Sequence, residues 1–234
     1  MSITGIFDLP KPISKYSLFV FDLDGTLYSQ SKLRKKLVIA LIFKFLTFSL
    51  KRIDYKIISE FRKQREMHKA YTSPALESEQ YEWVADKLKV PPETVAKTID
   101  KWMGDFPLNY LRSCRYTGID LCFNELKKKQ KKIAVYSDYP ADEKLKALDL
   151  VAHAAFCSTD KQISQLKPGK KGLTYICSQF NIAPEKTIFI GDRTDTDGES
   201  AKLAGTDFLK VNVHEASGGI FFMRLLNQLK SDYE

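Results

Sequence analysis

Cysteine and histidine are scarce in this sequence of 234 residues, which contains four cysteines and three histidines. The cysteines form no CxxC pair, and none of these residues stands at the spacing of a zinc site. Residues 1–12 lack a basic segment followed by an apolar stretch, so we expect no export signal. The sequence therefore predicts reduced thiols and a cytoplasmic protein.

Long hydrophobic runs are also missing. The longest, residues 37–50, is interrupted by Lys44 and is shorter than the roughly 20 residues that span a membrane. Hydrophobic residues make up 44% of the chain and charged residues 28%, which excludes a disordered or collagen-like protein. A globular protein with a buried core is expected.

Short apolar stretches alternate with helical patterns in the C-terminal half. We expect strands at residues 17–22, 132–137, 154–158, 187–191 and 208–213. We expect helices at residues 141–150, 170–181 and 197–204. This alternation predicts an α/β fold, a doubly wound parallel sheet with helices on both faces. Residues 28–114 have a mostly helical pattern, so we expect an all-helical cap domain there and a core domain of residues 1–27 and 115–234.

Two aspartates follow the first expected strand. In an extended backbone Asp22 and Asp24 point to the same side, so both can face one reacting centre. Gly25 permits a sharp turn at the carboxyl end of the strand, where open α/β sheets bind ligands. An Asp-Gly turn without any chemical role is the alternative for this segment alone.

A second acidic segment, with Asp192, Asp195 and Asp197, follows the fourth expected strand. Carboxylates crowded at a strand end repel one another, and a hard divalent cation relieves that repulsion. Two weaker signals lie between the acidic segments: Ser137 ends the second expected strand, and Lys167 follows the third. Each of these two, taken singly, is more typical of a strand-end cap or a solvated lysine.

The order of these four segments resembles that of the motifs of the haloacid dehalogenase-like hydrolase superfamily. The resemblance covers residues 15–30 and 118–213 and is closest to phosphatases with a helical cap, such as phosphoglycolate phosphatase. It rests mainly on the Phe-Asp-Leu-Asp-Gly-Thr-Leu segment at residues 21–27 and the Gly-Asp-Arg-Thr-Asp-Thr-Asp segment at residues 191–197.

The resemblance implies a role for each matching residue. Asp22 would be the nucleophile that becomes an aspartyl-phosphate, and Asp24 would be the general acid and then the general base. Lys167 would pair with Asp22 and, with Ser137 and Thr26, bind the phosphoryl group. Mg²⁺ would be held by the following residues: Asp22, Asp24 through its backbone carbonyl, Asp192 and Asp197, with Asp195 as an alternative to Asp197.

These roles together predict Mg²⁺-dependent hydrolysis of a small phosphomonoester under a closing cap. Asp24 favours phosphate esters, because dehalogenases lack this acid and phosphorylated transport ATPases carry another residue there. Asp138 departs from the asparagine that is frequent at this position and leaves the substrate open. A phosphosugar mutase with the same aspartyl-phosphate and a non-catalytic binding protein on this scaffold are the alternatives.

The positive charge of the chain is concentrated in the expected cap. Residues 28–70 contain 12 lysines and arginines against three acidic residues, around the apolar residues 37–50. A helix that is apolar on nearly every side is buried in its own protein or in a homodimer, or it contacts lipid. Peripheral binding of residues 32–52 to an anionic membrane is therefore the alternative to burial in protein. Residues 127–132 and the GxxG of residues 169–172 fit a solvated helix end and the hydrolase loop, so no nucleic-acid partner is expected.

Overall fold

The computed structural model describes residues 7, 9–46 and 51–231. These residues form a five-stranded parallel sheet in the order β3-β2-β1-β4-β5. The strands are β1 (Leu18–Phe21), β2 (Lys132–Ser137), β3 (Ala154–Cys157), β4 (Thr187–Gly191) and β5 (Asp207–Lys210). The sequence-based expectation of a doubly wound α/β fold is confirmed, with β5 shorter and earlier than expected.

Side chains alternate between the two faces of the sheet and are buried on both. In β1, Phe19 and Phe21 pack into one hydrophobic cluster while Leu18 and Val20 pack into the other. Burial on both faces explains why the strand is apolar throughout instead of alternating with polar residues. The first cluster is covered by α6 (Ile119–Lys128), α7 (Asp142–Leu148), α10 (Val213–Ser217) and α11 (Ile220–Ser231), and the second by α8 (Lys171–Phe180) and α9 (Glu199–Ala204).

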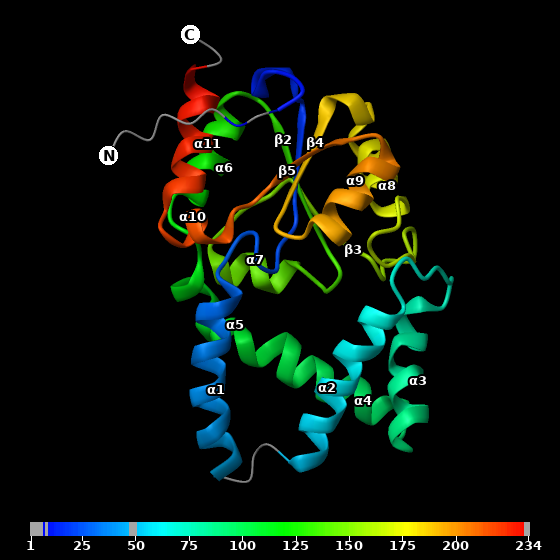
Figure 1. The fold of residues 1–234 in the computed structure, drawn as a ribbon. Helices are drawn as coiled ribbons and strands as arrows, with labels where there is room; N and C mark the ends of the chain where they lie inside the picture. The colour runs from blue at the N-terminus through cyan, green and yellow to red at the C-terminus, as the bar shows by residue number, and fades with distance from the viewer. Residues whose placement is uncertain (1–6, 8, 47–50, 232–234) are drawn as a thin grey trace.

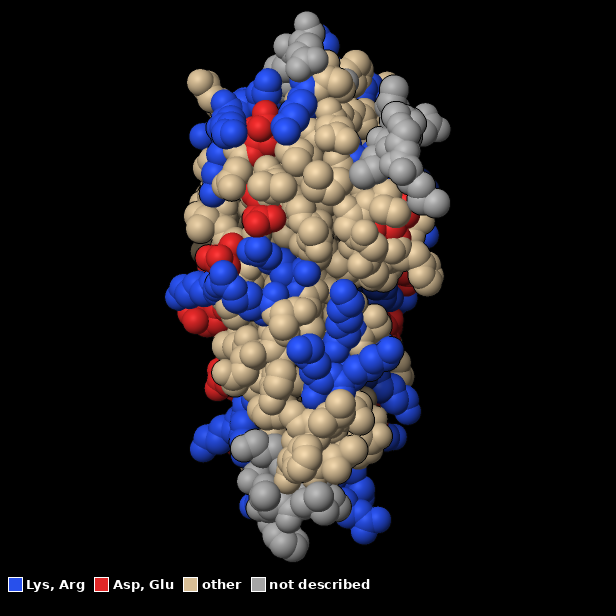
Figure 2. Space-filling model, turned by 90° about the vertical axis from the view of Figure 1, so that its left-hand side faces the viewer, with Lys and Arg blue, Asp and Glu red and all other residues tan. Residues whose placement is uncertain are grey.

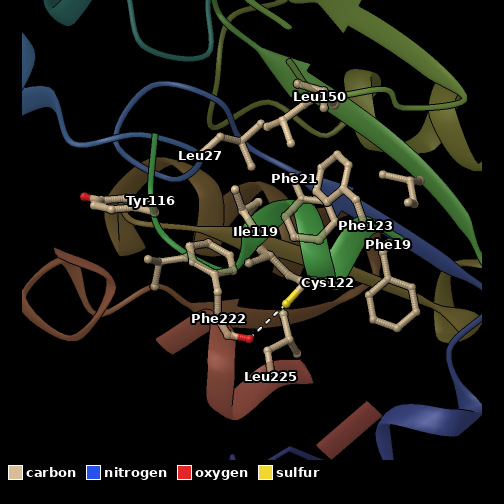
Figure 3. Close-up of a cluster of buried hydrophobic side chains, with 14 of the residues drawn as sticks. Phe19, Phe21, Leu27, Tyr116, Ile119, Cys122, Phe123, Leu150, Phe222 and Leu225 are labelled. Carbon is tan, nitrogen blue, oxygen red and sulfur yellow. Dashed lines mark hydrogen bonds between the residues drawn. The ribbon is translucent and has the colours of Figure 1, made fainter. Parts of the chain in front are cut away.

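The larger cluster is dense and aromatic. Figure 3 shows Phe21 of β1 against Phe123 of α6, and the ring centroids lie 5.0 Å apart. Cys122 lies among these rings and donates its S–H to the carbonyl oxygen of Phe222 at 2.9 Å. Burial raises the pKa of the Cys122 thiol. All four cysteines are buried free thiols, as the absence of paired cysteines in the sequence predicted.

Between β1 and α6 the chain forms a set of helices that stands beyond the carboxyl ends of the strands (Figure 1). We call residues 30–114 the helical insertion. Its elements are α1 (Gln30–Leu46), α2 (Arg52–Met67), α3 (Leu76–Leu88), α4 (Pro92–Ile99), a π-helical turn (Asp100–Asp105), α5 (Phe106–Leu111) and a 3-10 turn (Arg112–Cys114). No strand occurs among the residues of the insertion that are described, as its helical pattern predicted.

The insertion has a small core of its own, in which Ile57 and Phe61 of α2 pack against Val84 of α3 and Val95 of α4. An isolated antiparallel bridge joins Tyr28 to Arg115, where the chain leaves the sheet and returns to it. The division of the chain into two domains near these residues stays a prediction. Among the described helices, none combines the length and the apolar character that crossing a bilayer requires.

Candidate active site

Asp22 is placed by the end of the central strand. Its backbone N–H donates to the Ile190 carbonyl at 2.8 Å, which continues the pairing of β1 with β4 by one residue. Because the chain order of the strands reverses between β1 and β4, this is the point at which doubly wound sheets bind ligands. The carboxylate of Asp22 is buried at that point, where the residue is 7% exposed.

Two glycines let the neighbouring carboxylates approach closely. A Cβ at Gly25, which has a φ of +105°, would lie 2.5 Å from Asp192 Oδ2. A Cβ at Gly191 would likewise lie 2.5 Å from Asp197 Oδ2. The Asp197 carboxylate is held by the Arg193 backbone N–H at 3.1 Å, within the tight turn that follows β4. The glycines therefore make the space in which Asp192 and Asp197 stand beside β1.

Lys167 connects the two acidic segments. Its Nζ donates to Asp22 Oδ1 at 2.7 Å, to Asp197 Oδ1 at 2.9 Å and to the Tyr136 carbonyl at 3.1 Å. The side chain is almost fully buried, and these two carboxylates raise the pKa of Lys167 although burial by itself would lower it. A protonated ammonium therefore faces the Asp22 oxygen that the sequence predicted to be the nucleophile.

The carboxylates outnumber this cation. Oxygens of Asp22, Asp192 and Asp197 all lie within 4.8 Å of one another. Burial raises the pKa of Asp22, and the charges of Asp197 and Asp192 raise it further against the opposing effect of Lys167. Burial and the charge of Asp197 raise the pKa of Asp192 to about 6. A group of hard oxygens that holds excess negative charge fits a divalent cation such as Mg²⁺.

The Asp24 carboxylate is not part of this group of three carboxylates and has partners of its own. Lys144 on α7 donates to its Oδ1 at 2.8 Å and its Oδ2 at 2.9 Å, and the Tyr28 hydroxyl donates to Oδ1 as well. Burial by itself would raise the pKa of Asp24, but Lys144 and Tyr28 hold it below its ordinary value. The backbone carbonyl of Asp24 accepts a hydrogen bond from Gln30 Nε2 at 2.6 Å. Asp24 is therefore ionised in this arrangement.

The two remaining predicted site residues, Ser137 and Thr26, are both buried. Ser137 is buried at the end of β2, where its Oγ accepts a hydrogen bond from the Tyr139 N–H at 3.1 Å. Thr26 is also fully buried, with its Oγ1 3.5 Å from Asp192 Oδ1. Phosphate binding by Ser137 and Thr26 stays a prediction.

The structure separates the two candidates for the outer metal ligand. Asp197 lies in the carboxylate group described above, whereas Asp195 is exposed and pairs with Lys69 of the insertion at 2.8 Å. Arg193 pairs with Asp195 at 2.9 Å and with Glu66 of α2 at 2.8 Å. These contacts connect the loop after β4 to the insertion.

A cavity of about 280 Å³ lies between the carboxyl ends of the strands and the insertion. Its lining includes Asp24 and Lys167 from the core and the cations Arg34, Arg62 and Arg65 from the insertion. Leu33, Leu37, Trp102, Met103, Pro107 and Tyr139 add apolar surface. The cavity offers a small anionic molecule both positive charge and an apolar wall.

Two cations of this site could not be identified from the sequence. Arg65 is buried, and its Nη2 donates to the Asp138 carbonyl at 2.6 Å and lies 3.7 Å from the Asp138 carboxylate. It thereby offsets the negative charge that Asp138 brings to the lining of the cavity. Lys144 is one of many lysines in the chain, and only the position of α7 beside β1 shows that it reaches Asp24. Neither residue belongs to a motif that sequence reasoning used.

Comparisons with known proteins agree with this geometry. The model of the family described as haloacid dehalogenase-like hydrolase matches residues 19–211. No curated protein matches the sequence.

Solved structures share the fold at low identity. A predicted phosphoglycolate phosphatase from Haemophilus somnus has 19% identity and a TM-score of 0.52, and the match covers 84% of this chain and 85% of that one. A 2-haloacid dehalogenase from Pseudomonas syringae has 16% identity and a TM-score of 0.58, and the match covers 84% of this chain and 86% of that one. YfnB from Bacillus subtilis, solved with bound magnesium, has 16% identity and a TM-score of 0.56, and the match covers 84% of this chain and 89% of that one.

The three similar structures include both a dehalogenase and a protein described as a phosphatase, so they are informative about fold and not about substrate. The family model, by contrast, matches residues 19–211, a range that contains both acidic segments, Ser137 and Lys167. The resemblance found in the sequence is therefore confirmed, and this chain belongs to the haloacid dehalogenase-like hydrolase family.

Proposed function

We propose that this protein hydrolyses a small phosphomonoester with Mg²⁺ through an aspartyl-phosphate intermediate on Asp22. The observation that carries the proposal is the contact of Lys167 Nζ with Asp22 Oδ1 at 2.7 Å beside a group of three carboxylates. A phosphate ester is itself anionic, so it approaches a carboxylate nucleophile only where cations offset the repulsion. Lys167 supplies one such charge at the nucleophilic oxygen.

In the first step an oxygen of Asp22 bonds to phosphorus while the bond to the ester oxygen breaks. Asp24 then has to give a proton to the leaving oxygen, although Lys144 keeps it ionised in the resting site. A phosphoryl dianion that arrives beside Asp24 adds a like charge and competes for Lys144, and both effects raise the pKa of Asp24. Asp24 would thus take up a proton from solvent as the substrate binds, and this is the proton that it gives to the leaving oxygen.

In the second step water attacks phosphorus and Asp22 leaves as a carboxylate. The water loses a proton to Asp24, which left the first step as a carboxylate paired with Lys144. Inorganic phosphate and the original Asp22 are restored. By lowering the pKa of Asp24, Lys144 favours the loss of its proton in the first step and weakens it as a base in the second, after which Asp24 returns the proton to solvent.

Asp22, Asp192 and Asp197 would hold Mg²⁺, with the Asp24 carbonyl as a further protein oxygen. The bound cation supplies charge that offsets the excess of carboxylates and screens the phosphoryl group. Asp197 is proposed for this role instead of Asp195, because Asp195 is turned toward Lys69.

A screen of phosphorylated metabolites for phosphate release, with Mg²⁺ and with a chelator, tests the proposal. We expect Mg²⁺-dependent release from at least one small phosphomonoester, and a phosphoryl group on Asp22 in peptides from rapidly quenched enzyme. An isomerised sugar phosphate without free phosphate would identify a mutase instead. Ligand binding without turnover, or release of halide from haloacids, would also contradict the proposal.

A further inference from the structure

The distal half of α1 presents apolar side chains to solvent. Val38 is 56% exposed, Ile39 59%, Ile42 54% and Phe43 65%. The opposite side of the helix is the packed one, where Leu33 is buried and Leu37 lines the cavity. The sequence left open whether this helix is buried in its own protein. In the structure only one side of the helix packs against the protein, and the other side is exposed to solvent.

Cations surround this apolar surface. Lys32, Arg34, Lys35 and Lys36 are exposed on the preceding turns of α1. The start of α2 adds three further exposed cations and an aromatic ring, namely Lys51, Arg52, Lys56 and Tyr55. Between residues 30 and 56 the sequence contains one acidic residue, Asp54. The carboxylate of Asp54 accepts hydrogen bonds from the Lys51 N–H and the Trp102 indole.

Figure 2 shows this arrangement on the face that α1 occupies. Lysine and arginine side chains gather over the insertion, uncharged atoms extend below them toward its distal end, and acidic side chains keep to the margins of that region. Along α1 the cations therefore come first, and the exposed apolar residues follow them toward the distal end.

We propose that the distal end of the insertion, residues 32–43 of α1 with residues 51–56 of α2, docks on an anionic lipid surface. A rise of about 1.5 Å per residue places Phe43 roughly 10 Å beyond Lys36 along α1, which is about the depth that interfacial helices reach into a bilayer. The apolar residues of α1 enter the boundary of the acyl chains while the lysines of its preceding turns meet lipid phosphates. The cations at the start of α2, which lies at the same distal end, reach the phosphates through their long side chains. Residues 47–50, which complete the apolar run, lie outside the described residues.

Charge distinguishes this occupant from a second copy of the chain. In a symmetric dimer each apolar end would meet its own equivalent, and the surrounding lysines of both copies would face each other. Like charges placed across an interface oppose association, whereas anionic headgroups are complementary to them. The inference does not depend on the proposed phosphatase activity.

Vesicle co-sedimentation at low salt tests the proposal. Wild-type protein is expected to bind vesicles that contain phosphatidylserine, to bind neutral phosphatidylcholine vesicles weakly, and to be released by salt. Replacing two cations together, Lys35→Gln with Lys36→Gln, should weaken binding roughly 30-fold. Replacing two apolar residues, Ile42→Ser with Phe43→Ser, should weaken it at least about tenfold.

Matched variants elsewhere on the surface serve as controls. Lys210→Gln with Lys230→Gln removes the same charge from exposed positions of the core, and Val151→Ser removes an apolar side chain that is 68% exposed. Both should bind vesicles as the wild type does. The proposal is wrong if wild-type protein stays in the supernatant with anionic vesicles, or if the control variants lose as much binding as the α1 variants. A concentration-dependent dimer that Phe43→Ser abolishes would assign the surface to a second copy.

Discussion

Two groups of charged residues each include side chains of the loop after β4, and their surroundings differ. The buried cluster contains Asp22, Lys167 and Asp197, whose residues are 7%, 4% and 2% exposed. The exposed cluster contains Glu66, Lys69, Arg193 and Asp195, whose side chains are between 41% and 55% exposed. Their ion-pair distances are nearly the same, from 2.7 to 2.9 Å within the buried cluster and from 2.8 to 3.4 Å within the exposed one.

The comparison shows that distance alone does not determine what an ion pair does. Solvent screens the exposed pairs, which contribute about 0–1 kcal/mol each. In the buried cluster each charge has lost its hydration, so removing one partner leaves another uncompensated. We therefore expect the buried cluster to be the more sensitive to mutation, whereas the exposed cluster connects the insertion to the core.

The largest difference between the clusters should appear in turnover. We expect Asp22→Asn to reduce phosphate release at least about 10⁴-fold, because an amide is a poor nucleophile. Asp195→Asn, the matched change in the exposed cluster, should leave release within about twofold. Circular dichroism and phosphate release measured on both variants check this. Turnover of Asp22→Asn within tenfold of wild type would remove Asp22 from the nucleophile role.

The second difference concerns stability. Lys167→Met leaves Asp22 and Asp197 buried without their cation, so the free energy of unfolding in Mg²⁺-free buffer should fall by about 3–5 kcal/mol. Lys69→Met should change it by less than about 1 kcal/mol. Urea denaturation of the two variants and the wild type gives both values. Equal losses would show that the burial of Lys167 is not what makes it important.

Asp24 stands between the two clusters in exposure, and its role depends on the leaving group. Asp24→Asn should slow hydrolysis of alkyl phosphates about 10²-fold or more, because their leaving oxygen needs a proton. The loss in the phosphorylation step should be smaller for an activated aryl phosphate, which leaves as a stable phenolate. Single-turnover kinetics with both esters measure that step. The same loss with both would argue against the general-acid role.

The smallest effect is a difference in pH dependence between two lysines of α7. Lys144 pairs with Asp24, whereas Lys146 is exposed and pairs with Glu143. In the wild type the lowered pKa of Asp24 adds stability above about pH 4, and this is lost as the pH falls through the folded-state pKa. Without Lys144, burial favours the neutral carboxyl, so its pKa rises and stability falls as the pH rises above about 4.

Lys144→Met should therefore lower the free energy of unfolding by about 1–3 kcal/mol at about pH 7.5 and by less at about pH 4.5. Lys146→Met should leave it unchanged at both values, because solvent screens this exposed pair. Denaturation curves at the two pH values check the sign. A destabilisation by Lys144→Met that is larger at the acidic pH would show that Asp24 is not held ionised by Lys144.

Much of the fold could be predicted because its signals are local. β1 is apolar throughout since both faces of a parallel sheet are covered, and β2, β3 and β4 begin where their patterns predicted. The end of β5 was placed three residues too late, because Val211 is buried without being part of the strand. Local patterns identify an apolar segment but not the residue at which its pairing ends.

The sequence by itself determined the order of the strands and helices and the identity of the acidic segments, because the periodicity of buried residues and the spacing of carboxylates are written along the chain. Only the tertiary structure decided which charges meet. Asp197 instead of Asp195 lies beside Lys167, Lys144 reaches Asp24 across 120 residues, and Arg65 enters from the insertion to offset Asp138. Burial and distance depend on how separate segments pack, and for charged side chains they decide between a solvated surface and a reactive site.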